Sequence, residues 1–121
     1  MHRKKPFLAS LGHACNGLYA FFATERNARI HAVLAVMVIA AAVCFSLTAM
    51  QWLVILLCIA AVMALEMVNS AIEKLCDLVH ADYHPMIKTI KDISAAAVLL
   101  AAIISAIAGL IIFLPKIIAW L

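Results

Sequence analysis

The sequence predicts an all-α membrane protein with an N-terminal amphipathic surface helix and three transmembrane helices. Of its 121 residues, 69% are apolar and 12% are charged, whereas soluble domains are about half apolar and a quarter charged. Two uncharged stretches, 30–50 and 93–114, are long enough to cross a hydrocarbon core of about 30 Å. The composition excludes a water-soluble globule and a disordered chain, and a net charge of +3 is too small to indicate a nucleic-acid partner.

The predicted surface helix covers residues 7–25. Its apolar residues recur at three- and four-residue spacing, which gives the helix one apolar stripe suited to the membrane surface. This stripe is formed by Leu8, Leu11, Cys15, Leu18 and Phe22. Polar residues interrupt the middle of the segment, so we expect neither a fourth span nor a cleaved signal peptide, and the N-terminus is expected to stay in the mature protein.

The three transmembrane helices are predicted at about 29–50, 52–79 and 90–114, within a single membrane domain covering residues 1–121. The second helix spans the bilayer only if it continues through its acidic residues, which must then face protein rather than lipid. Pro85, in the connection to the third helix, is expected to break the helix. No C-x-x-C pair occurs, so the four cysteines are interpreted as small apolar fillers and not as a disulfide framework or a zinc site.

The distribution of Lys and Arg predicts the orientation, because cytoplasmic flanks collect positive charge. With the N-terminus inside, eight basic residues are cytoplasmic and only Lys116 is outside. The eight are Arg3, Lys4, Lys5, Arg26, Arg29, Lys74, Lys88 and Lys91.

A polar stripe runs along the second predicted span. Glu66, Asn69, Glu73 and Asp77 follow at i, i+3, i+7 and i+11, which confines them to an arc of about 80° on a helix. Glu66 lies roughly 10 Å deeper in the membrane than Glu73. A charged side chain inside the bilayer costs about 2.5 to 3.5 kcal/mol on insertion scales, so a function is expected here. The alternatives are a structural hydrogen bond to a neighbouring helix and a proton-relay acid in a transporter.

Carboxylates at a membrane boundary suit a hard divalent cation, and Mg²⁺ is typically held by one or two carboxylates plus substrate phosphates. Glu25, at the junction of the surface helix and the first span, lies at a similar depth to the stripe. An ion pair with Arg26 or Arg29 is the alternative interpretation of Glu25.

Basic residues stand at the mouth of the third span, where Lys88 and Lys91 flank Asp92 and are suited to neutralising phosphate. The chain contains no P-loop, dinucleotide-binding or protein-kinase signature. A nucleotide site in this chain would therefore be built from helices.

A resemblance to a known family is carried by HACNGLYAFFATERNARIH, ALEMVNSAIEKLCDLV and DYHPMIKTIKDISAAAVLLAAI. From about Ser10 to the C-terminus, the chain closely resembles the small prokaryotic integral-membrane diacylglycerol kinases and their undecaprenol kinase relatives. The resemblance implies a homotrimer whose active sites are shared between chains at the cytoplasmic face of the bacterial inner membrane. It also implies ATP- and Mg²⁺-dependent transfer of the γ-phosphoryl group to the hydroxyl of diacylglycerol or undecaprenol, in phospholipid or cell-envelope lipid metabolism.

The resemblance further implies roles for individual residues. Glu66 corresponds to the catalytic base, and Glu25 and Glu73 correspond to the metal ligands. Residues expected around the nucleotide are Glu25, Asn69, Glu73, Asp77, Asp82, Tyr83, His84, Lys91 and Asp92. Contacts to the lipid substrate are expected from His13, Glu66 and Ser94. Gly12 stands where many relatives carry a basic residue, and Lys4 and Lys5 are the candidates to supply that charge.

Two other classes of function compete with a lipid kinase. A small proton-coupled transporter needs one membrane carboxylate, but it has no use for Glu25, Lys91 and Asp92 at the water boundary. A non-catalytic assembly partner would explain the hydropathy but not the polar stripe. Within the kinase family, GLIIFLPKI and IKTIKDISAAAVLL resemble the undecaprenol kinase branch more closely.

Overall fold

The computed structural model describes residues 6–121, which form four helices: α1 (Phe7–Thr24), α2 (Arg26–Cys44), α3 (Ala49–Val79) and α4 (Pro85–Trp120). The three longer helices, α2, α3 and α4, are each long and apolar enough to cross a membrane. The predicted all-helical class with three candidate spans is therefore confirmed. The predictions for Arg3, Lys4 and Lys5 lie outside the described residues.

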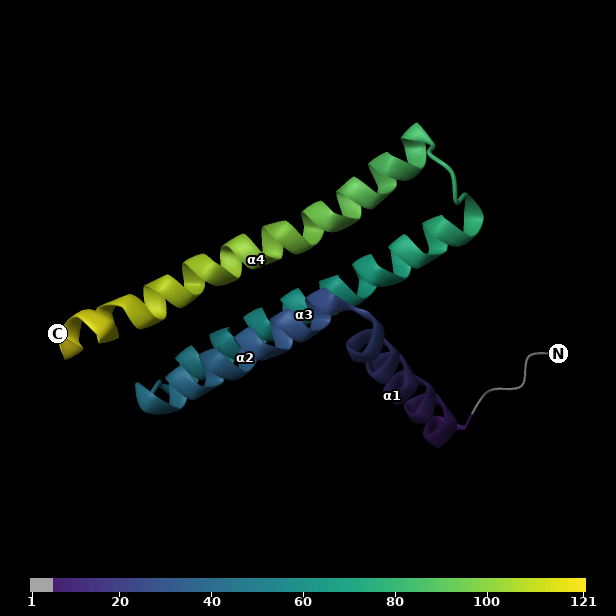
Figure 1. Cartoon of the computed structure of the whole chain (residues 1–121). Coiled ribbons are helices and arrows are strands. Elements are labelled where there is room, and N and C mark those ends of the chain that lie inside the picture. Colours follow the sequence, from purple (N-terminus) through teal and green to yellow (C-terminus); the bar gives the residue numbers. More distant parts are fainter. Residues whose placement is uncertain (1–5) are drawn as a thin grey trace.

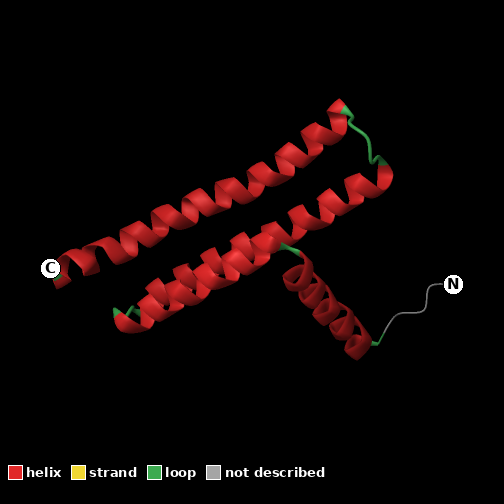
Figure 2. Ribbon diagram, viewed as in Figure 1, coloured by secondary structure: helices red, strands yellow, loops and turns green. Residues whose placement is uncertain are grey.

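The helix α3 is the central element of the chain. It forms an antiparallel hairpin with α2, and α4 returns along it, while α1 leaves this bundle at a steep angle (Figure 1). Short loops connect the helices (Figure 2). In the apolar 18-residue stretch of α3, 28% of the residues are buried within the chain. The corresponding stretches of α2 and α4 each have 11% of their residues buried. Because α3 has neighbours on two sides, its polar stripe can be covered by protein.

The turn between α2 and α3 is closed by two capping motifs. Ser46 adopts a left-handed conformation (φ 53°), and the amides of Ser46 and Leu47 donate to the carbonyls of Val43 and Ala42, which is a Schellman motif. Thr48 then begins α3 with a capping box, in which it exchanges hydrogen bonds with Gln51. These caps end the first span at Cys44, six residues before the predicted limit of 50.

The last helix is longer than the predicted 90–114. Pro85 occupies its first turn, where a missing N–H costs nothing, so the residue expected to break a helix begins one. At the other end α4 continues past Pro115 to Trp120. Pro115 removes the backbone hydrogen bond to the Ile111 carbonyl, but the remaining turns of the helix are retained.

The apolar core lies beside the α2–α3 turn. Ala42, Leu47, Ile55 and Ile112 form a buried cluster from α2, the turn, α3 and α4, and the ring of Phe45 packs edge-on against Phe113 and Trp120. This cluster fixes one end of the bundle, whereas the polar stripe of α3 occupies the other half of that helix.

Most other large apolar side chains remain exposed on the single chain, as expected of helices that meet lipid or further protein chains. On α1, Leu8, Leu11 and Leu18 of the predicted apolar stripe are exposed, and Phe21 is the residue that packs inward. The stripe of α1 is therefore available to an external apolar surface.

Candidate active site

A single residue, Glu25, joins α1 to α2. Its backbone is extended (φ −103°, ψ 119°), and it serves both as the C-cap of α1 and as the N-cap of α2. Its carboxylate Oε1 lies 2.9 Å from Nζ of Lys74 on α3, and the same ammonium donates to Oγ1 of Thr24 at 3.4 Å. Glu25 therefore pairs with Lys74 of α3, and within residues 6–121 it forms no ion pair with Arg26 or Arg29.

Glu66 is buried between α2 and α3, with 4% of its surface exposed. Nδ2 of Asn27 donates a long hydrogen bond to Oε1 of Glu66 at 3.4 Å. Nε2 of His31, one turn further along α2, lies 3.8 Å from the other oxygen, Oε2. Two polar side chains of α2 thus face the carboxylate of Glu66, which is buried in a helix apolar enough to cross a membrane.

The middle of the stripe is also buried. Asn69 is 7% exposed and Ser70 is 4% exposed, and Nδ2 of Asn69 donates to Oε1 of Glu73 at 3.5 Å. Oδ1 of Asn69 is buried and has no hydrogen-bond partner among residues 6–121. A buried acceptor without a partner is uncommon, so this oxygen is available to a ligand.

The outer end of the stripe meets the first turns of α4. Nζ of Lys91 lies 2.6 Å from Oδ1 of Asp77, and Lys88 pairs with Asp92 one turn along the same helix. Exposed ion pairs of this kind contribute little to stability. The Lys91–Asp77 pair instead fixes a position, because it holds the Lys91 ammonium at the outer end of the acidic stripe.

The connection between α3 and α4 leaves its polar side chains exposed. Nδ1 of His84 accepts a hydrogen bond from the Met86 amide at 3.1 Å, so this ring caps α4. Asp82 and Tyr83 are exposed beside it, His13 is exposed on α1, and Ser94 is half-buried on α4. Within the described chain no side-chain hydrogen bond joins any of these last four residues to the stripe.

Three residues of the site were not predicted as part of it: Asn27, His31 and Lys74. The signal for the first two was present, because polar residues at i and i+4 share one face of an otherwise apolar helix. For Lys74, the sequence indicated only a cytoplasmic charge, since its partner Glu25 lies 49 positions earlier in the chain.

The candidate metal ligands are side-chain oxygens, which suits a magnesium ion that also binds the phosphates of a substrate. No group of three or more His, Cys, Asp or Glu side chains suited to a metal occurs within residues 6–121, which argues against a site made of protein ligands alone. Mg²⁺ needs only one or two carboxylates when phosphates complete its shell. Glu73, Glu25 and the unpartnered oxygen of Asn69 are oxygen donors of the kind that Mg²⁺ prefers.

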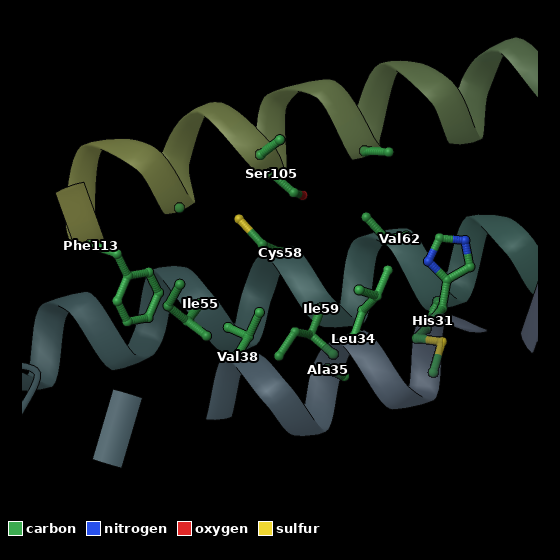
Figure 3. Close-up of a pocket in the computed structure, with 14 residues that line it drawn as sticks. His31, Leu34, Ala35, Val38, Ile55, Cys58, Ile59, Val62, Ser105 and Phe113 are labelled. Atoms are coloured by element: carbon green, nitrogen blue, oxygen red, sulfur yellow. The ribbon is translucent and has the colours of Figure 1, made fainter. Parts of the chain in front are cut away.

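An apolar groove of about 340 Å³ opens beside Glu66, between α2, α3 and α4. His31 lies at one end of the groove and Phe113 at the other (Figure 3). The walls include Val62 and Cys58 from α3 and Ser105 from α4. Since Nε2 of His31 lies 3.8 Å from Oε2 of Glu66, one end of the groove is formed by a neighbour of the buried carboxylate.

Comparison with known proteins identifies the family. Residues 12–113 match the model of the prokaryotic diacylglycerol kinases. The chain is 41% identical over 110 residues to an undecaprenol kinase of Bacillus subtilis. This alignment covers 91% of this chain and 89% of the relative. The chain is 42% identical over 113 residues to a diacylglycerol kinase of Synechocystis, covering 93% of this chain and 65% of the relative. A diacylglycerol kinase of Escherichia coli is 29% identical over 100 residues, covering 83% of this chain and 82% of the relative. The chain therefore belongs to the prokaryotic diacylglycerol kinase family and is a multi-pass membrane lipid kinase.

Proposed function

We propose that this protein transfers the γ-phosphoryl group of ATP to the hydroxyl of a membrane lipid alcohol at the polar stripe of α3, with Glu66 as the general base. The observation that carries this assignment is the placement of Glu66. The residue is 4% exposed, lies in a helix apolar enough to span the membrane, and is 3.8 Å from His31, which lines an apolar groove. A lipid hydroxyl that cannot leave the bilayer needs a base at that depth.

The reaction uses the two ends of the stripe differently. Glu66 removes the proton of the lipid hydroxyl as the lipid oxygen bonds to the γ-phosphorus, and the bond to the β-phosphate oxygen breaks to release ADP. Lys91 contributes positive charge for the phosphates at the water-facing end, where Asp77 positions it in this structure. Phosphoryl transfer depends mainly on in-line positioning and charge neutralisation, so helices suffice without a P-loop.

The proposed ligands of magnesium are Glu25 and Glu73, and the unpartnered side-chain oxygen of Asn69 is a further candidate. When bound, the ion supplies neutralisation of the phosphate charge. Lys74 holds Glu25 in this structure and keeps that carboxylate on the α3 side of the junction. Asn69 likewise orients Glu73 through its amide nitrogen.

We propose undecaprenol as the preferred lipid alcohol. The match to the Bacillus undecaprenol kinase extends over 89% of that relative, compared with 65% of the Synechocystis diacylglycerol kinase at similar identity. The groove beside Glu66 is lined almost wholly by apolar side chains and suits a hydrocarbon chain without further polar groups.

The purified enzyme, offered each lipid alcohol with radiolabelled ATP and Mg²⁺, is expected to phosphorylate undecaprenol with at least a tenfold higher kcat/KM than diacylglycerol, a difference of about 1.4 kcal/mol in transition-state binding. Equal values for the two alcohols, or a preference for diacylglycerol, would contradict the assignment of undecaprenol. Phosphorylation of neither alcohol would contradict the proposed reaction itself.

We further propose a homotrimer oriented with its N-terminus and active sites on the cytoplasmic side. Eight of the nine basic residues then lie inside, and neighbouring chains cover apolar helix faces that the single chain leaves exposed. The extra chains also close the part of the stripe that α2 and α4 leave open.

If sites are shared between chains, two inactive variants are expected to complement each other. Glu66→Gln and Lys91→Met chains, co-reconstituted into mixed trimers, should recover a measurable fraction of wild-type turnover, because some interfaces then contain one intact set of residues. Each variant alone provides the baseline. If mixed trimers are demonstrated by affinity tags and activity stays at that baseline, Glu66 and Lys91 act within one chain.

A proton-coupled transporter is not favoured by these observations. The chain belongs to a kinase family, and a kinase has a use for Asp77 and Lys91 at the outer end of the stripe. A transporter requires only the buried acid.

A further inference from the structure

The contacts that α2 makes with Glu66 have a second consequence for the reaction. We propose that His31 takes up the proton that Glu66 removes from the lipid hydroxyl, and that Asn27 determines which oxygen of Glu66 receives it. This inference rests on the proposed role of Glu66 as the base. It makes His31 a proton carrier and Asn27 a positioning residue.

The two oxygens of Glu66 have different partners. Oε1 accepts the amide hydrogen of Asn27 at 3.4 Å, whereas Oε2 faces Nε2 of His31 at 3.8 Å. The amide cannot accept a proton from Oε1, so the oxygen able to exchange protons is Oε2. A separation of 3.8 Å exceeds a hydrogen bond, and a bridging water or a small side-chain rotation closes it. Catalytic hydrogen bonds are commonly this loose before substrate binds.

A buried base needs a route by which to lose its proton. The Glu66 side chain is 6% exposed, whereas the His31 side chain is 24% exposed. Once protonated, the acid is confined between α2 and α3, and it must release the proton before the next turnover. His31 lies 3.8 Å from Glu66 and forms the end of the groove opposite Phe113, which makes it the nearest titratable side chain able to carry the proton away from the buried acid.

The proton balance has three steps. The lipid O–H bond breaks and an O–H bond forms at Oε2 of Glu66 while the phosphoryl group is transferred and ADP leaves. The proton then passes from Oε2 to Nε2 of a neutral His31, which restores the carboxylate and creates an imidazolium. The imidazolium finally releases the proton to water, and both side chains return to their starting states.

The surroundings of His31 contain few other titratable groups. On α3, Glu66 contacts it and Cys58 lines the same groove, while α4 lines that groove with Ala102, Ser105, Ala106, Gly109 and Phe113. Glu25, at the α1 junction, pairs with Lys74, and the arginines of α2 itself, Arg26 and Arg29, are exposed. Glu66 is therefore the acid whose charge His31 meets directly.

Three variants of the full-length enzyme test the proposal in lipid-containing micelles. His31→Gln retains a hydrogen-bonding side chain but cannot carry a proton, and its kcat at saturating lipid and ATP is expected to fall at least about tenfold, with little change in the KM for ATP. The pH dependence of kcat is expected to differ between the wild type and His31→Gln, because only the wild type has an imidazole beside Glu66. The matched control Asn27→Ala removes the other polar partner and should lower kcat while keeping the wild-type pH profile.

Chemical rescue provides a readout that a structural role would not produce. His31→Ala opens space at the end of the groove, and millimolar imidazole is expected to restore its turnover severalfold while leaving Glu66→Gln inactive. Nucleotide binding and the thermal midpoint in detergent establish that each variant is folded. A folded His31→Ala that imidazole does not rescue, or a His31→Gln with wild-type kcat and pH profile, overturns the relay even if Glu66→Gln is inactive. Full activity of Glu66→Gln would instead overturn the proposed function.

Discussion

Replacing Glu66 by glutamine is expected to lower kcat by about 10² to 10⁴-fold while the assembled protein and its affinity for ATP are retained. The amide is nearly the same size and keeps hydrogen-bonding groups for Asn27, but it has no basic oxygen, and general-base catalysis contributes an effect of this size. Single-turnover assays with radiolabelled ATP measure the chemical step, and equilibrium nucleotide binding measures the retained affinity.

Ser70 provides the matched control for this substitution. It lies one helical turn further along α3 and is as buried as Glu66, at 4% exposed, so Ser70→Ala also removes a buried polar group from the same helix. Its kcat is expected to stay within a few-fold of the wild type. Comparable losses in both variants would mean that any polar deletion in this helix disables the enzyme, and the base would have to be sought elsewhere.

Replacing Glu25 or Glu73 by glutamine is expected to raise the Mg²⁺ concentration for half-maximal rate by roughly tenfold or more, because losing even an outer-shell partner of a metal ligand costs about 10- to 100-fold in affinity. Saturating Mg²⁺ should recover part of the lost rate in each variant. Initial rates across a magnesium titration at fixed ATP give the value directly.

Lys74→Gln separates loss of a ligand from loss of an ion pair. It breaks the contact to Glu25 but keeps both carboxylates in the chain, so its magnesium requirement is expected to rise less than that of Glu25→Gln. If Lys74→Gln raises the requirement as much as Glu25→Gln does, the ion pair and not the carboxylate is what matters. An unchanged requirement in both carboxylate variants would show that the metal site is elsewhere.

Periodicity predicted the parts of this fold that depend on one helix at a time. The spacing of Glu66, Asn69 and Glu73 placed them on one face of α3, and the structure buries the first two and joins the last two by a hydrogen bond. Helix ends were predicted less well, because they depend on caps that hydropathy does not contain. The Schellman motif at Ser46 shortened the first span, and α4 extended through Pro115.

Contacts between helices could not be predicted from the sequence pattern. The spacing shows that Asn27 and His31 share a face of α2, but only the register of α2 against α3 brings that face to Glu66. Glu25 shows the same limit. Its nearest charges along the chain are arginines, yet the packing pairs it with Lys74.

The single-residue junction between α1 and α2 has a mechanical consequence. Because Glu25 ends one helix and begins the next without an intervening loop, rotation about its backbone swings the whole 18-residue α1 as a rigid arm. The same rotation displaces the carboxylate that Lys74 holds against α3. A change in the tilt of the arm therefore also moves the backbone that carries this carboxylate.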